Sequence, residues 1–119
     1  MNIVSFALEL SSTKVLPRPG DPAWLGWLTA EELLYCMGLQ RAGEHLGARA
    51  MAKRAAARAI GWPHEVPWRD IEIRRSPLGR PTLAMSGDGD GWRRGHGLPV
   101  PGISMAHAAG NVAAISWLP

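Results

Sequence analysis

The most restrictive feature of this 119-residue sequence is an alanine-rich stretch from Glu44 to Ile60. Alanine has the highest intrinsic helix propensity, and Gly61 followed by Trp62 and Pro63 is typical of a helix end. Small residues recur along the stretch at helical spacing: Ala48, Ala52, Ala55 and Ala59. We therefore predict one long helix over residues 44–60, with a small-residue face that lets another element approach closely.

The opposite side of this predicted helix is basic. Arg49 and Lys53 are four residues apart, as are Arg54 and Arg58, so each pair of like charges lies together on the surface and repels. No carboxylate follows Glu44 within the helix. We expect this side to face either solvent or an anion.

The rest of the chain predicts strands, a second helix and loops. The predicted strands are 3–10, 70–74, 82–85, 103–106 and 111–117, and the last four form two hairpins. Thr29, with Glu32 three residues later, forms a capping box that begins the second helix. Residues 76–79 predict a turn, and 87–97 lack periodicity and predict a long mobile loop that is a candidate lid. This order indicates an α+β fold with an antiparallel sheet.

Composition indicates one globular domain over residues 1–119, because 46% of the residues are hydrophobic and 19% are charged. The chain has no long apolar run, no signal-peptide pattern and one cysteine, Cys36, so we expect a cytoplasmic protein without disulfides or membrane spans. The net charge is +3, and eleven of the thirteen cationic residues lie between Arg41 and Arg94. Such a basic segment suits an anionic partner. Since no nucleic-acid-binding motif is present, nucleic acid is not the expected partner.

Six short segments occur in a fixed order along the chain. They are Leu28-Thr29 with Glu32 ("L-T-x-x-E"), residues 49–55 ("R-x-A-x-K-E-A"), 59–61 ("A-L-G"), 70–73 ("I-E-V"), 79–87 ("G-x-P-x-L-x-L-x-G") and 104–107 ("S-x-S-H"). With these segments the chain resembles the holo-(acyl carrier protein) synthase family of 4′-phosphopantetheinyl transferases, whose patterns are given in parentheses.

This resemblance implies a fold, an assembly and a reaction. The expected fold is the small α+β phosphopantetheinyl transferase-like fold, with an antiparallel sheet packed on a long helix. Members of the family form homotrimers with the active site between subunits. They transfer the 4′-phosphopantetheine arm of coenzyme A to a serine of an acyl carrier protein. Mg²⁺ bridges the pyrophosphate, held by an Asp near the end of the first strand and by the Glu of "K-E-A".

The sequence departs from the family at both of these metal ligands. The Glu of "K-E-A" is replaced by Arg54, whose guanidinium cannot coordinate Mg²⁺. Counting from the N-terminus places Glu9 at the position of the family Asp, which we prefer. Aligning on the following "V-E-I" instead places Phe6 there and makes Glu9 the second acid. In either alignment one carboxylate remains, so we predict no metal site.

The candidate catalytic residues follow from the same motifs. Lys53 matches the family Lys and would contact phosphate or help deprotonate an attacking group, unless it is a solvated helix lysine. Arg54 would bind pyrophosphate oxygens or form an ion pair with Glu9. Glu9 would otherwise act as a general acid or base. His107 would contact an anion or transfer a proton. Further candidates for ligand binding are Arg49, Arg58, Trp92 and Ser104.

Three functions remain open. In the preferred interpretation the protein is a repurposed, metal-independent acid–base enzyme. It would catalyse a cyclisation, elimination or isomerisation in polyketide synthesis or another carrier-protein-dependent pathway, with an acyl carrier protein, a carrier-bound intermediate or a small molecule as partner. The alternatives are an altered phosphopantetheinyl transferase and a non-catalytic module that docks a carrier protein. No cofactor is required, although coenzyme A is a possible ligand.

Overall fold

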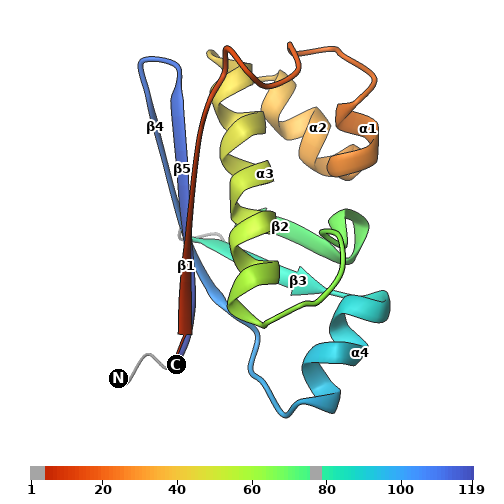
Figure 1. Ribbon diagram of the computed structural model, residues 1–119. Coiled ribbons are helices and arrows are strands. Elements are labelled where there is room, and N and C mark those ends of the chain that lie inside the picture. The colour runs from red at the N-terminus through yellow and green to blue at the C-terminus, as the bar shows by residue number, and fades with distance from the viewer. Residues whose placement is uncertain (1–4, 76–78) are drawn as a thin grey trace.

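The structure is a computed structural model that describes residues 5–75 and 79–119 (Figure 1). Its elements are β1 (Ser5–Ser12), α1 (Trp24–Trp27), α2 (Ala30–Met37), α3 (Ala42–Ala59), the 3-10 helix η1 (Trp68–Asp70), β2 (Ile71–Arg75), β3 (Pro81–Met85), α4 (Gly87–Gly95), β4 (Gly102–Ala108) and β5 (Asn111–Leu118). None of the helices in these two ranges combines the length and the apolar character needed to cross a membrane.

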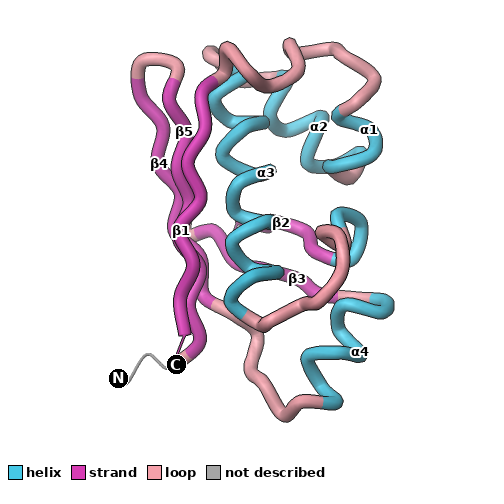
Figure 2. The backbone as a smooth tube through the Cα atoms, in the orientation of Figure 1, coloured by secondary structure: helices cyan, strands magenta, loops and turns pink. Residues whose placement is uncertain are grey.

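The strands form two separate antiparallel sheets with α3 between them. One sheet has the order β1-β5-β4, and β2 and β3 make a two-stranded sheet of their own. In Figure 2 the three strands run alongside α3 on one side, while the β2–β3 hairpin crosses it on the other. The α+β fold with antiparallel pairing is confirmed, although the strands are divided between two sheets.

The small residues of α3 allow its close approach to the three-stranded sheet. The alanines at 48, 52, 55 and 59 are all buried. Gly47 is also buried, and a Cβ atom built on it would lie 2.8 Å from Leu16 Cδ1 and 3.2 Å from Val112 Cγ1. The predicted small-residue face is therefore correct, and Gly47 is a point of close contact with Val112 of β5.

Most predicted elements are confirmed. The long helix begins two residues earlier than expected and ends at Ala59, and both predicted hairpins are present. The capping box is complete, because Thr29 Oγ1 accepts from the Glu32 amide and Glu32 Oε1 accepts from the Thr29 amide. The first strand extends to Ser12. Its predicted first residues, and residues 76–78 of the predicted turn, lie outside the described residues.

The prediction of a mobile loop over 87–97 is wrong, because Gly87–Gly95 form α4. Its glycines have low helix propensity, so contacts beyond local sequence stabilise the helix. The Asp70 carboxylate accepts from the Gly89 amide at 3.0 Å, near the helix start. Asp90 pairs with Arg93 at 2.7 Å and with Arg94 at 3.0 Å along the helix. The structure therefore gives no support for a lid made of this segment.

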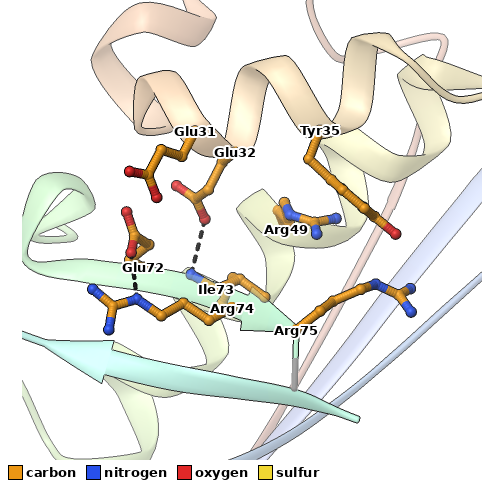
Figure 3. A pocket seen from close by; sticks show the side chains of 8 residues that line it. All are labelled: Glu31, Glu32, Tyr35, Arg49, Glu72, Ile73, Arg74 and Arg75. Atoms are coloured by element: carbon orange, nitrogen blue, oxygen red, sulfur yellow. Dashed lines mark hydrogen bonds and ion pairs between the residues drawn. The ribbon is translucent and has the colours of Figure 1, made fainter. Parts of the chain in front are cut away.

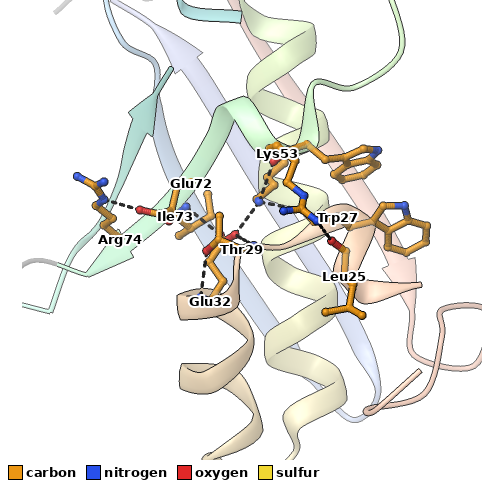
Figure 4. Close-up of polar contacts among 10 residues, drawn as sticks. Leu25, Trp27, Thr29, Glu32, Lys53, Glu72, Ile73 and Arg74 are labelled. Atoms are coloured by element: carbon orange, nitrogen blue, oxygen red, sulfur yellow. Dashed lines mark hydrogen bonds and ion pairs between the residues drawn. The ribbon is translucent and has the colours of Figure 1, made fainter. Parts of the chain in front are cut away.

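One buried carboxylate connects three elements (Figure 4). Glu32 Oε1 lies 2.6 Å from Lys53 Nζ on α3, and its Oε2 accepts from the Ile73 amide of β2 at 2.9 Å. Lys53 Nζ also donates to the carbonyl oxygens of Trp27 at 2.9 Å and Trp68 at 3.0 Å. Both charged side chains are almost fully buried, so each is stabilised by the other and by these hydrogen bonds.

The expectation of one basic helix face open to solvent or an anion is wrong for Lys53, whose three donors are all engaged inside the protein. Arg49 and Lys53 are buried, whereas Arg54 and Arg58 are exposed. The carboxylate that pairs with Lys53 comes from α2, 21 residues earlier in the chain, and spacing within the helix could not reveal it.

We predict that Lys53→Met destabilises the protein by about 3 kcal/mol, because it leaves the Glu32 carboxylate buried without a cation. Arg54→Met is the matched control: the neighbouring residue is exposed, and its ion pair is expected to contribute about 0.5 kcal/mol or less. Urea unfolding followed by circular dichroism measures both changes. Equal, small effects would contradict the structural role of Lys53.

We also predict that Gly47→Ala destabilises the protein by about 1 kcal/mol, although alanine is the better helix former. The added methyl group would press on Val112, a stiff β-branched side chain on β5. Gly43→Ala, in the same helix, meets only ordinary contacts with Pro19 at 3.6 Å and should be neutral or stabilising. Thermal unfolding of both variants provides the comparison, and a stabilised Gly47→Ala protein would show that the contact is loose.

Candidate functional site

Glu9, Arg54 and Arg58 form a cluster where β1 passes the exposed side of α3. Glu9 Oε1 lies 3.5 Å from Arg54 Nε, and Glu9 Oε2 lies 3.5 Å from Arg58 Nη1. The Glu9 side chain is 16% exposed, whereas the Arg54 and Arg58 side chains are 49% and 61% exposed. Glu9 thus faces two cations, as the ion-pair alternative predicted.

The guanidiniums of this cluster keep free donors. Both ion pairs are longer than a strong charge-assisted hydrogen bond. Among the described residues, Arg58 Nη1 donates only to the Leu8 carbonyl oxygen at 3.3 Å, and Arg54 makes no hydrogen bond. Their remaining N–H groups reach solvent and are available to an anionic ligand.

The strand register separates the two positions considered for the family Asp. Glu9 is on the side of β1 that faces α3, level with Arg54. Phe6 is on the opposite side of the sheet and is 66% exposed. Of Glu9 and Phe6, only Glu9 lies beside Arg54 within one chain.

The residues in this cluster do not fit Mg²⁺. That ion takes oxygen ligands in octahedral geometry, usually one or two carboxylates with phosphates and water. Here both oxygens of the single carboxylate face guanidinium groups. Across residues 5–75 and 79–119, no group of three or more His, Cys, Asp or Glu side chains is placed to hold a metal ion. The donor set is suited to an anion.

Arg49 lies apart from this cluster, in a pocket between α2, α3 and β2 (Figure 3). Its side chain is directed over the ring of Tyr35, with Cζ 4.7 Å from the ring centroid. Lys53 also lies away from the cluster, in the Glu32 network, where Nζ already has three hydrogen-bond acceptors. Burial lowers the pKa of the Lys53 ammonium, although the charge of Glu32 opposes this shift. No Lys53 donor remains for a phosphate.

His107 is positioned by Glu44, a residue that the sequence marked only as the helix start. His107 Nδ1 lies 2.8 Å from Glu44 Oε1, and Glu44 Oε2 accepts from the Gly110 amide at 2.9 Å. Both hydrogen bonds lower the pKa of the Glu44 carboxyl group, and the bond with His107 has the larger effect. Nε2 is the ring nitrogen that remains available. His107 also lines a shallow pocket of about 480 Å³ at the end of the sheet.

The remaining candidates do not join the cluster. Ser104 is exposed on β4, on the sheet face opposite to α3 and paired with Ile115. Trp92 lies on α4, where its indole N–H donates to the Ile60 carbonyl oxygen at 3.2 Å and its ring meets Trp62 edge-on. Trp92 thereby fixes α4 against the end of α3, and it does not face the Glu9 cluster.

No protein-family model matches the chain. Comparisons with individual proteins, in contrast, agree on one family. A holo-[acyl-carrier-protein] synthase of Koribacter versatilis is 41% identical over 101 residues, which cover 77% of this chain and 75% of that protein. One from Streptomyces coelicolor is 36% identical over 120 residues, covering 97% of this chain and 96% of its own length.

The fold agrees with this result. The crystal structure of the holo-[acyl-carrier-protein] synthase from Neisseria meningitidis superposes with a TM-score of 0.84 and 27% sequence identity, and the match covers 99% of both chains. Such agreement extends from β1 to β5, including the segments that carried the sequence resemblance. The chain belongs to the holo-(acyl carrier protein) synthase family of phosphopantetheinyl transferases.

Proposed function

We propose that the protein is an altered phosphopantetheinyl transferase that binds the pyrophosphate of coenzyme A with arginines where the family uses a metal ion. The observation that carries this proposal is the pair of exposed guanidiniums of Arg54 and Arg58 on either side of Glu9. The relatives are named as holo-[acyl-carrier-protein] synthases and match 77% and 97% of this chain. They support transfer more directly than the repurposed acid–base enzyme that the sequence favoured.

The charge of the cluster supports pyrophosphate binding. Two guanidiniums and one carboxylate leave a net charge of about +1, which attracts phosphate oxygens. Arginine binds such oxygens through two parallel N–H donors and keeps its charge at all physiological pH values. Glu9 would hold the two side chains near each other and reduce the repulsion between them. Preorganised donors of this kind stabilise the charge that develops in the transition state.

The proposed reaction is a displacement at phosphorus. The serine hydroxyl of the carrier protein attacks the phosphorus attached to the pantetheine arm. The bond from this phosphorus to the bridging oxygen breaks, and 3′,5′-ADP leaves with that oxygen. Arg54 and Arg58 would donate to the departing phosphate, and the serine proton passes to a base. His107, oriented by Glu44, is the candidate base if it reaches the site from a neighbouring subunit.

A second copy of the chain suits the outer face of the three-stranded sheet. Phe6, Leu8 and Leu10 alternate along β1 on the face opposite to α3, and each is at least half exposed. Ile115 and Trp117 of β5 continue the same apolar face. An apolar face of this extent on a small protein favours association, which supports the predicted homotrimer with active sites between subunits. The single domain over 1–119 and the polyketide setting also stay predictions.

The repurposed enzyme remains a second candidate because of one observation, the loss of the metal-binding glutamate at Arg54. Both functions use the same cluster. The decisive difference is whether the phosphopantetheine arm reaches a carrier protein.

Transfer from coenzyme A to an apo acyl carrier protein is expected to proceed in EDTA as well as with Mg²⁺, with the added arm detected by mass spectrometry. Arg54→Gln should lower kcat/KM by about 10²- to 10³-fold, the usual effect of removing one preorganised donor. Arg94→Gln, an exposed arginine on α4, is the charge-matched control and should have no effect.

Two results would contradict this proposal. Transfer that requires Mg²⁺ and is unaffected by Arg54→Gln would show that the arginine does not replace the metal. No transfer by the natural sequence, together with transfer by Arg54→Glu in Mg²⁺, would show that the phosphoryl chemistry is lost. The latter result would favour the repurposed enzyme, or a docking module if the carrier binds without conversion of any intermediate.

For the assembly, we expect Leu8→Glu to yield monomers, because a charge at the centre of the apolar face opposes its burial. Val15→Glu replaces an equally apolar, exposed residue outside the sheet and should leave the assembly intact. Sedimentation equilibrium of both variants measures the oligomeric state. A wild-type protein that is monomeric at high concentration would refute the trimer.

A further inference from the structure

The tip of the β4–β5 hairpin is attached to the start of α3 through Glu44. This residue lies in the first turn of α3 and is buried. Its Oε1 lies 2.8 Å from His107 Nδ1 on β4, and its Oε2 accepts from the Gly110 amide, in the turn between the two strands, at 2.9 Å. Each oxygen of the carboxylate therefore already has a partner on the hairpin.

The turn at this tip is strained and relies on contacts from outside the hairpin. Ala109 has a φ of 51°, in the left-handed region that a residue with a Cβ atom rarely adopts. Besides the hydrogen bond from the Gly110 amide to Glu44, the Gly110 carbonyl oxygen accepts from the Thr13 amide at 2.8 Å. Loss of the contact with Glu44 would therefore favour a rearrangement of the turn.

A second imidazole, that of His45 on α3, lies directly beside the Glu44–His107 contact. The centroids of the His45 and His107 rings are 4.4 Å apart, and the ring planes meet at 62°. Basic side chains of α3, β2 and β4 act on Glu44 or His45: Arg41, Arg49, Arg75 and His107. Burial lowers the pKa of His45, these cations lower it further, and the charge of Glu44 opposes the shift.

We propose that His45 and His107 form a pH-sensitive switch that releases the hairpin tip from α3 in mildly acidic solution. When both imidazoles are protonated, two positive charges in contact share the one Glu44 carboxylate, and they repel each other. His45 is held by the long helix, whereas His107 lies next to the end of its strand. Movement of the tip is therefore the motion that separates the two charges.

Release of the tip would change the pocket at this end of the three-stranded sheet. The pocket, of about 480 Å³, is lined by residues of β1, β4 and β5, among them Leu10, His107 and Asn111. Because the tip carries part of this lining, the pocket keeps its shape only while Glu44 holds the hairpin. The switch acts through the packing of the hairpin on α3, so it is independent of whether the protein transfers phosphopantetheine.

The dependence of Tm on pH gives the first test. Because the pKa of His45 is lowered in the folded protein, the unfolded chain binds more protons below about pH 6.5, and stability is lost as the pH falls from there. Between about pH 7.5 and 5, we expect the Tm of the natural protein to fall about 3 °C further than that of His45→Phe, which keeps an aromatic ring without the charge. His64→Phe, which removes an exposed imidazole elsewhere, should keep the full loss.

The NMR signal of the Gly110 amide gives a second test, which locates the change at the hairpin tip. We expect this signal to move over the same pH range in the natural protein and to stay constant in His45→Phe, because the hydrogen bond to Glu44 is broken only when His45 is charged. His45→Gln is the second variant should the phenylalanine disturb folding. The hydrogen bonds of Glu44, that with His107 first, lower its pKa from 4.5, so protonation of the carboxylate itself falls at lower pH.

Two results would overturn the proposal. A Gly110 signal that does not move above about pH 5 in the natural protein would show that the tip stays in place. An equal fall in Tm, with the same movement of the Gly110 signal, in the natural protein and in both His45 variants would show that His45 has no part in the change.

Discussion

The Glu32–Lys53 pair determines how the rest of the molecule is arranged around α3. The carboxylate begins α2 through the capping box, binds the ammonium of α3 and accepts the Ile73 amide of β2. Because Lys53 points into this network, the next residue of the helix points about 100° away, towards β1. The buried pair thus helps to set the rotation of α3 and with it the exposure of Arg54.

Local sequence patterns were sufficient where local interactions decide the structure. The capping box at Thr29, the alanine-rich α3 and the two hairpins were predicted from short-range rules, and the structure confirms them. The pairing of Glu9 with Arg54 followed from the chemistry of a strand carboxylate and the family resemblance together. α4 was missed because contacts with Asp70 and Trp62, distant in sequence, offset its low helix propensity.

The site was harder to predict than the fold, because the spacing of residues on a helix does not reveal how deeply each side chain is buried. Arg49, Lys53 and Arg54 have similar sequence surroundings, yet one lies in a pocket, one in the core and one near the surface. Their different partners come from α2 and β1. The Glu44–His107 pair likewise joins residues 63 positions apart. The role of each charged residue depends on a partner that is distant in the sequence. A single sequence indicates such partners only where it resembles a known family.

The cationic residues of α3 are neutralised by carboxylates to three different degrees. This difference determines which of them remain able to bind an anion. Lys53 has a full partner in Glu32 and contributes to stability. Arg54 and Arg58 share one carboxylate, so the β1 side keeps a partial excess of positive charge. Arg49 has no carboxylate partner among the described residues. A fully paired cation is a poor ligand for a phosphate, whereas an incompletely paired one gains energy by binding it. The net charge also bears on the replacement of a glutamate by Arg54. A divalent metal ion with two carboxylates has a net charge of zero, whereas two guanidiniums and one carboxylate have a net positive charge. The replacement therefore keeps an attraction for the phosphates of coenzyme A.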